Sequence, residues 1–504
     1  MSDLPPHDHD PETLLGAAAT VELGADRAIR GGALRVVGYA TGVLVSLGAA
    51  AILVRQLGIA GFGRYVTVTS LVALVGGLTE AGIVVYGIRE FVARDEEERR
   101  TMLGGLLAMR LALTVVGVAC AVVFGVVAGY RDVLVLGTLV AGAGLLGQVA
   151  ADVLSVPLQA QLLLGRLTAI EVGRRLLALA LIGALALAGA GLVPFFAATS
   201  VAAFGAAIAM ARTARSLVAI RPRFDWPAWR RLFADTLPYA VGLSVAAIYL
   251  YVTVIVMSVI ASATQTGLFG TSFRVTQAVL AVPSLLLTAI FPLMSRGRAA
   301  GTGAAAAEGG FGATVGKVFA VAVMLGTWMT IATVLGAGFV IDVIAGHGGR
   351  AAAPVLRIQA IVFLPSFVST SSALGLVALE RYRPLLAASA ATLVLDIALG
   401  LALVPSLGAE GGALADVIAE AVSALTLTTL LVRSVPDHEI RPSFVPALVL
   451  AAGAAAVSLA LPIGSFGRAA LGSILFFAVL LRSGALPREV ADVARRLPRL
   501  GART

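Results

Sequence analysis

The chain has 504 residues, of which 59% are apolar and 13% are charged, and this charged fraction is about half that of an ordinary soluble domain. Because a soluble protein has too little interior to bury so much apolar surface, the composition excludes a soluble enzyme, a disordered scaffold and a disulfide-stapled secreted module. The formal net charge of +9 would suggest a nucleic-acid partner in a soluble protein, but in a membrane protein it more often reflects basic cytoplasmic loops.

Fourteen apolar runs, each of about 20 residues and bounded by charge, Gly or Pro, predict membrane-spanning helices. The first six are Leu34–Val54, Tyr65–Gly87, Leu103–Ala128, Val133–Ser155, Ala169–Ala188 and Leu192–Ala211. After a polar break, the next six are Leu237–Ile260, Leu268–Met294, Thr314–Ile344, Val355–Val377, Leu385–Val404 and Gly411–Val432. Two shorter runs, Val445–Leu461 and Phe466–Leu481, follow.

Short glycine turns follow the first span and the seventh span. The first turn is Gly61-Phe62-Gly63 and the second is Gly267-Leu268-Phe269-Gly270. A parallel repeat of six plus six spans, related by an axis along the membrane normal, produces this pattern. We therefore expect an all-α polytopic membrane protein of about 14 transmembrane helices, with two six-helix lobes in pseudo-twofold repeat and two C-terminal helices.

This repeat divides the chain into six parts. They are a cytoplasmic tail over 1–33, an N-lobe over 34–211, a cytoplasmic amphipathic connector over 212–235, a C-lobe over 236–432, the last two spans over 433–482 and a cytoplasmic tail over 483–504. Most of the 37 basic residues lie on loops that share one side with the N-terminus, when Arg174 and Arg175 at the start of a span are assigned to the adjacent loop. By the positive-inside rule, both termini are cytoplasmic in a multi-pass protein of the cell membrane.

Two glycine motifs resemble nucleotide-binding signatures, but their surroundings argue against that chemistry. The motif over 142–147 lies inside a predicted span with no preceding strand, where small residues allow close helix packing. The stretch ending at Gly316-Lys317 has Phe311 and Val318 where a phosphate-binding loop needs Gly and Ser or Thr. The single cysteine, Cys120, lies in an apolar run. We therefore expect no disulfide, no metal site and no cofactor.

The segment 220–231 interleaves arginines with Trp226 and Trp229, as nucleic-acid surfaces do. Its place on a predicted cytoplasmic loop instead favours a helix at the level of the lipid headgroups, with both tryptophans at the interface. We therefore expect membrane lipid as a partner and no nucleic acid.

Ionisable residues inside predicted spans are candidate functional residues, because a charge at the bilayer centre is costly. The basic candidates are Arg110 and Arg274. The acidic candidates are Glu80, Asp396, Asp416 and Glu420, of which the last two are four apart and share one helix face. Two structural alternatives remain open: Arg110 can extend to the headgroups, and the carboxylates can pair with arginines of neighbouring helices.

Four segments, spread between residues 30 and 432, match a known family in order and spacing. They are Arg55-Gln56-Leu57-Gly58 with Gly61-Phe62-Gly63-Arg64-Tyr65; Glu80-Ala81-Gly82 with Arg89-Glu90; Gly267-Leu268-Phe269 with Arg274 and Phe291-Pro292-Leu293-Met294-Ser295-Arg296; and Pro405 with Gly408-Ala409-Glu410-Gly411-Gly412-Ala413. In these segments the chain resembles the polysaccharide-export, O-antigen-type flippases of the multidrug/oligosaccharidyl-lipid/polysaccharide (MOP) superfamily. Glu80 stands where that family commonly has Asp, and Asp396 where it commonly has Asn.

The resemblance implies two lobes around a central cavity, with alternating access across the membrane. The implied substrate is an oligosaccharide on a polyprenyl pyrophosphate, moved to the outer leaflet for cell-surface polysaccharide biosynthesis. A pyrophosphate needs fixed cations in a low-dielectric cavity, and guanidinium groups bind it bidentately. The candidates are Arg274 and Arg110 inside the membrane, with Arg35 and Arg89 at the cytoplasmic mouth.

The four intramembrane carboxylates are candidates for binding a coupling Na⁺ or H⁺. We expect a monomer, with a polysaccharide polymerase or glycosyltransferases as candidate partners. Two other functions stay open: a drug/cation antiporter of the MATE type in the same superfamily, and a membrane polysaccharide polymerase or ligase. The last is disfavoured, and no enzyme is expected, because such enzymes generally carry a large external loop and the longest here span only 345–354 or 55–64.

Overall fold

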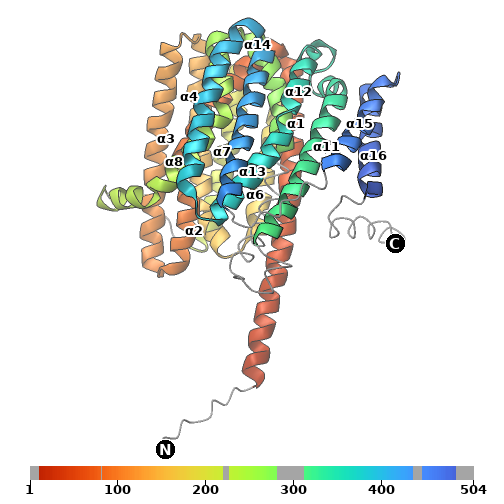
Figure 1. Ribbon diagram of the computed structural model, residues 1–504. Helices are drawn as coiled ribbons and strands as arrows, with labels where there is room; N and C mark the ends of the chain where they lie inside the picture. Colours follow the sequence, from red (N-terminus) through yellow and green to blue (C-terminus); the bar gives the residue numbers. More distant parts are fainter. Residues whose placement is uncertain (1–10, 81, 219–225, 281–310, 435–444, 484–504) are drawn as a thin grey trace, which may run out of the picture.

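The computed structural model describes residues 11–80, 82–218, 226–280, 311–434 and 445–483. Within these ranges every regular element is a helix, and most helices run roughly parallel as one bundle (Figure 1). In the first half the helices are α1 (Pro11–Glu80), α2 (Ile83–Ala93), α3 (Glu96–Val127), α4 (Asp132–Leu154), α5 (Val156–Ala160), α6 (Leu164–Leu187) and α7 (Leu192–Arg215).

The second half continues with α8 (Trp226–Ile260) and a helix over 263–280. The remaining elements are α11 (Phe311–Ala345), the 3₁₀ turn η1 (His347–Gly349), α12 (Ala352–Ala360), α13 (Phe363–Ala378), α14 (Tyr382–Ser434), α15 (Val445–Ala456), η2 (Val457–Ala460) and α16 (Ser465–Ser483). The last pair, α15 and α16, lies at one edge of the bundle beside α11 (Figure 1).

Eight helical segments within the described ranges are long and apolar enough to cross a membrane. Two of them, Gly38–Ala93 and Tyr382–Ser434, each contain two predicted spans. The junction inside α1 is Gly58 (φ 70°, ψ 172°) and the junction inside α14 is Gly408 (φ 56°, ψ −127°). Because only glycine adopts these positive φ values at little cost, one residue is enough to separate consecutive spans.

Several predicted boundaries differ from the structure. The second predicted span, Tyr65–Gly87, is interrupted because α1 ends at Glu80 and Gly82 has a φ of 73° before α2 starts. The tenth, Val355–Val377, is divided between α12 and α13. The helix over 263–280 covers the first part of the eighth span, and residues 281–294 lie outside the described ranges.

The predicted tail and connector also contain helix. Residues 11–33 belong to α1, whose first part projects beyond the other helices (Figure 1). The end of the connector is the start of α8, which continues without interruption into the seventh span. Trp226 is exposed, as expected for an interfacial residue, whereas Trp229 is 6% exposed and packs with Phe91 and Leu103. The first turns of α8 are therefore attached to α2 and α3.

The two glycine segments predicted as turns are helical instead: 61–63 lies within α1 and 267–270 within the helix over 263–280. The two segments pack against each other where the halves of the chain meet. A Cβ added at Gly63 would overlap the Ala263 carbonyl oxygen, and one added at Gly267 would overlap the Ile59 carbonyl oxygen. At the same end, Arg55 Nη2 donates a hydrogen bond to the Val343 carbonyl at 2.6 Å. Glycine thus permits backbone-to-backbone contact that closes this end of the bundle. We call this contact the glycine closure.

Candidate functional site

A cavity of about 600 Å³ lies between the two halves of the chain. Its walls come from α1, α6 and α7 in the first half, and from α8 and the helix over 263–280 in the second. Its polar lining comprises Tyr39, Ser46, Tyr65, Arg174, Arg175, Thr199, Tyr251, Arg274 and Gln277. We call this space the central cavity. Three of its described lining residues are arginines and none is acidic.

Arg274 reaches the central cavity from the second half and contacts the first. Its Nη2 donates to Thr69 Oγ1 of α1 at 3.0 Å. Tyr65, which lines the same cavity, stacks on Phe196 of α7 with ring centroids 5.2 Å apart. Because stacked aromatic rings pack rigidly, the wall near the guanidinium is held in place.

Arg174 and Arg175 line the central cavity from α6, and our sequence analysis placed them in a loop instead. The Arg175 side chain lies over Gly42 of α1, where an added Cβ would overlap its guanidinium group. Glycine at this position therefore lets the arginine extend across α1. The sequence did contain a signal for this location, because the pair lies well inside the predicted span Ala169–Ala188 and not at its end. Positive-inside counting masked that signal.

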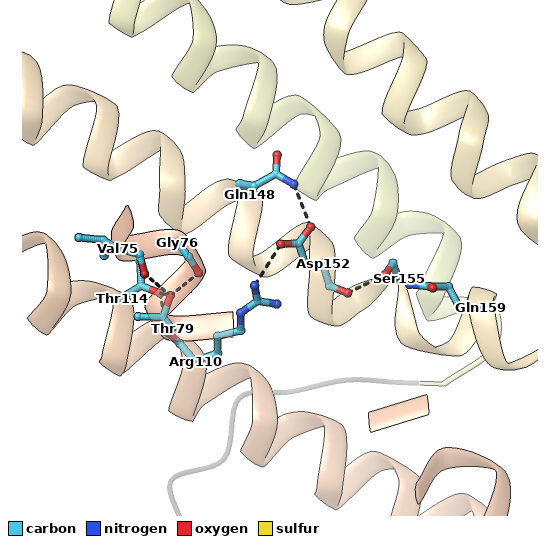
Figure 2. Close-up of polar contacts among 9 residues, drawn as sticks. All are labelled: Val75, Gly76, Thr79, Arg110, Thr114, Gln148, Asp152, Ser155 and Gln159. Carbon is cyan, nitrogen blue, oxygen red and sulfur yellow. Dashed lines mark hydrogen bonds and ion pairs between the residues drawn. The ribbon is translucent and has the colours of Figure 1, made fainter. Parts of the chain in front are cut away.

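Arg110 lies elsewhere, in a buried network of the first half (Figure 2). It is 1% exposed, and its Nη2 lies 3.2 Å from Asp152 Oδ2 of α4. Gln148 Nε2 donates to the other oxygen of the same carboxylate at 2.8 Å. The guanidinium points at Asp152 in Figure 2, and Arg110 is not among the residues that line the central cavity. This geometry fits the structural alternative of an ion pair between helices.

The other first-half candidates whose side chains are described do not line the central cavity either. Glu80 is exposed at the end of α1, and Arg89 is exposed on α2. The side chain of Arg35 lies outside the part of the chain whose side chains are described. Of the three predicted arginines whose side chains are described, one, Arg274, lines the central cavity.

Three of the four predicted carboxylates meet beside α8: Asp396 lies on α14 before the kink at Gly408, and Asp416 and Glu420 lie on α14 after it. Tyr249 Oη donates to Glu420 Oε2 at 2.5 Å, and Ser369 Oγ donates to the other oxygen of Glu420. Thr253 Oγ1 lies 3.0 Å from Asp396 Oδ2 and 2.7 Å from Asp416 Oδ1. We call Asp396, Asp416 and Glu420 the carboxylate cluster.

A second cavity, of about 230 Å³, adjoins the carboxylate cluster. Asp416 and Glu420 line it, and so does Gln277, which also lines the central cavity. Within the described ranges, no group of three or more His, Cys, Asp or Glu side chains is arranged to hold a metal ion.

The hydrogen bonds at Thr253 indicate that the carboxylate cluster holds a proton. A threonine hydroxyl has one hydrogen to donate, and ionised carboxylates only accept. Thr253 therefore cannot satisfy both Asp396 and Asp416 unless one of them is protonated and donates back. Asp396 is 2% exposed and its Oδ1 has no partner in the described structure, whereas Asp416 has the shorter bond to Thr253. A proton shared between these two carboxylates would satisfy both hydrogen bonds of Thr253.

Comparison with known proteins identifies the family of the chain. A family model described as "Polysaccharide biosynthesis protein" matches residues 28–298, more than half of the chain. Comparison with curated protein sequences gives no match.

Solved structures show the same fold. The lipid II flippase MurJ in an inward closed conformation superposes with a TM-score of 0.71 at 10% identity, covering 89% of this chain and 98% of that one. An inward-facing multidrug resistance MATE family transporter of the MOP superfamily gives 0.61 at 14% identity, covering 78% and 95%. A MOP superfamily transporter from Pyrococcus furiosus gives 0.55 at 16% identity, covering 81% and 95%. The predicted all-α polytopic fold is confirmed.

Proposed function

The chain belongs to the polysaccharide biosynthesis protein family of the MOP superfamily, and from that premise we propose that it is a flippase for a lipid-linked oligosaccharide. It would move a polyprenyl-pyrophosphate-linked sugar across the cytoplasmic membrane by alternating access. Family and fold together indicate a multi-pass membrane transporter. The sugar-lipid substrate and the direction of movement are parts of the proposal.

The observation that carries the proposal is the lining of the central cavity. Arg174, Arg175 and Arg274 face it from two different halves of the bundle, and no described lining residue is acidic. Asp152 and Glu171 lie near enough to Arg174 to interact with its charge, but neither lines the cavity. Three guanidinium groups that face a cavity without an acidic lining residue favour an anionic ligand. A pyrophosphate supplies that charge and accepts bidentate hydrogen bonds from arginine.

Alternating access requires the cavity to open to one side at a time. The glycine closure and the Arg55–Val343 hydrogen bond join the halves at one end. The central cavity extends along α1 from Leu53 back to Tyr39, away from that end. With the N-terminus in the cytoplasm, as the basic loops predict, this state is closed to the outside.

We assign ion coupling to the carboxylate cluster, with H⁺ as the coupling ion. Thr253 has one hydrogen for two neighbouring carboxylates, and a proton shared between them would supply the second, which supports H⁺ over Na⁺. The protein works without a cofactor in this proposal. It acts as a monomer that receives its substrate from glycosyltransferases and delivers it to a polysaccharide polymerase.

The test measures transport and binding in matched arginine variants. Arg274→Ala and Arg174→Ala should each reduce polysaccharide export and weaken binding of farnesyl pyrophosphate to the purified protein by about tenfold or more, because each removes a charge-assisted hydrogen bond. Arg212→Ala, which removes an exposed arginine at the end of α7, is the control. Unchanged export at normal protein levels in Arg274→Ala would remove this residue from the mechanism.

A drug/cation antiporter is the second candidate, and the smaller cavity is the observation that favours it. Asp416 and Glu420 line this cavity together with Tyr249 and Phe273, and carboxylates with aromatic rings suit an organic cation. The arginine-lined central cavity argues against this function. Tetraphenylphosphonium and farnesyl pyrophosphate distinguish the two, because an antiporter should bind the first and a flippase the second.

A further inference from the structure

A single buried side chain, Gln359 of α12, joins the carboxylate cluster to the helix over 263–280. It is 0% exposed. Its Oε1 accepts hydrogen bonds from Ser272 at 2.5 Å and from Thr276 at 3.4 Å. Its Nε2 lies 3.5 Å from Asp416 Oδ2. The carboxamide therefore contacts α14 with one end and the helix over 263–280 with the other.

The same helix carries Arg274 on its opposite side. Residues four apart share a helix face, so Ser272 and Thr276 both point toward Gln359, while a residue two positions along is rotated by about 200°. Arg274 accordingly extends into the central cavity and donates to Thr69 of α1. A shift of this helix that starts at Gln359 must therefore move the Arg274 guanidinium.

We propose that Gln359 is the positioning residue that transmits the protonation state of Asp416 to Arg274, so that proton binding changes the affinity of the central cavity for an anion. This inference rests on the proposed function. Gln359 touches neither the transported substrate nor the cavity in this scheme. It acts through the hydrogen bonds of Ser272 and Thr276.

The carboxamide can be satisfied in two opposite orientations. When Asp416 is ionised, the amide nitrogen faces it and the amide oxygen accepts from the two hydroxyls, because a carboxylate only accepts. When Asp416 is protonated, the amide oxygen can accept from it, and the nitrogen then donates to Ser272 and Thr276. The hydroxyls have acceptors on their own helix for this second state, the Phe269 carbonyl at 2.9 Å and the Ser272 carbonyl at 3.1 Å.

The two orientations of the carboxamide differ in the hydrogen bonds that the Ser272 and Thr276 hydroxyls form with carbonyl groups of their own helix. Ser and Thr hydroxyls that bond only to carbonyls of the preceding turn bend a helix. In the first orientation, the Gln359 amide oxygen competes with those carbonyls for the hydroxyl hydrogens. In the second orientation, the hydroxyls accept from the amide nitrogen and donate their hydrogens to the carbonyls alone. The bend falls over residues 269–276, which include Arg274.

Other titratable groups face Asp416 and must be considered with it. They are Asp396 and Glu420 of α14 and Tyr249 of α8. From α12, α13 and the helix over 263–280, the groups on this side are the amide and hydroxyls of Gln359, Ser369 and Thr276, none of which titrates. Tyr249 and Ser369 are occupied by Glu420. Among the described groups, Gln359 is thus the side chain that connects Asp416 to the helix that carries Arg274.

The test compares pyrophosphate affinity at several pH values in the purified full chain. In the unaltered chain, coupling of ordinary strength changes the affinity by about 5- to 150-fold across the titration of the cluster. Gln359→Leu should bind pyrophosphate but change by less than about twofold, because the link to Arg274 is lost. The titration of pyrophosphate itself is common to all variants and cancels in the comparison.

Two further variants make the test specific. Ser272→Ala combined with Thr276→Val removes the receiving hydroxyls, keeps Gln359, and should abolish the pH dependence even if Gln359→Leu does not fold. Ser372→Ala, which removes a buried hydroxyl bonded to Thr428 of α14 at 3.0 Å, is the matched control and should retain it. A full pH dependence in Gln359→Leu or in the double variant overturns the inference alone. Absence of pyrophosphate binding by the unaltered chain contradicts the proposed function as well.

Discussion

The glycine closure gives a direct way to shift the balance between the two access states. In Gly267→Ala the added Cβ would overlap the Ile59 carbonyl oxygen and lie 2.8 Å from the Ile59 carbonyl carbon. Ordinary contacts of this kind are several tenths of an ångström longer, and backbone atoms cannot rotate away as a side chain can. The substitution therefore penalises the closed state and leaves an open state, in which the halves have separated, unaffected.

The penalty expected for such overpacking is about 1–3 kcal/mol. That energy lowers the ratio of closed to open protein by about 5- to 150-fold. The change is confined to this interface, so the protein should still fold.

The assay is labelling of a cysteine placed behind the closure. Val66 is 0% exposed and lies against Gly270, so Val66→Cys in a Cys120→Ser background should react slowly with a membrane-impermeant maleimide. Adding Gly267→Ala should raise the labelling rate in proportion to the open fraction. Gly183→Ala, where an added Cβ meets nothing within 4 Å, should leave the rate unchanged. Equal rates in the Gly267→Ala variant and its parent would refute the closure.

Two further predictions concern the buried polar networks. Asp152→Asn should lower the free energy of unfolding by about 1–3 kcal/mol, because it leaves the buried Arg110 without a charged partner. Glu96→Gln, which removes an exposed ion pair with Arg100, should lower it by about 0.5 kcal/mol or less. Thermal unfolding followed by tryptophan fluorescence compares the two variants, and equal losses would contradict an ion-pair role for Arg110. Thr253→Val should move the pH dependence of transport toward higher pH, because the ionised Asp416 loses its 2.7 Å hydrogen bond and binds a proton more readily. The measurement is transport by proteoliposomes over a range of pH, and an unchanged pH profile would contradict the assignment of the proton to the carboxylate cluster.

The apolar periodicity of the sequence was sufficient to predict the class of fold. Runs of bilayer length recur along the chain because each backbone segment in lipid must satisfy its own hydrogen bonds, and a helix does so locally. The glycine segments over 61–63 and 267–270 were visible in the sequence, but the prediction that they form turns was wrong, because both are helical and their glycines permit close backbone contact instead. Boundaries were harder to predict, as the break after Glu80 shows, because a carboxylate followed by a glycine also occurs inside continuous helix in this chain, as at Asp396 and Gly400 of α14.

Within the site, the sequence identified which residues carry charge in the membrane, and Asp416 and Glu420 share a face simply because they are four apart on a helix. It could not say which helices face each other. Arg110 and Arg274 looked alike as isolated arginines in apolar runs, yet one pairs with Asp152 and the other lines the central cavity. Only the packing of distant helices separates these outcomes.

The arrangement of charge in this chain therefore has two origins. The number of basic residues and their concentration on one side of the predicted spans are local properties, so the sequence alone determined them. The grouping of Arg174, Arg175 and Arg274 around one cavity, and the link from Asp416 through Gln359 to the helix of Arg274, depend on contacts between residues far apart in the chain. Helical periodicity fixes the face of each residue but not the partner of that face, and the tertiary structure decides the partner.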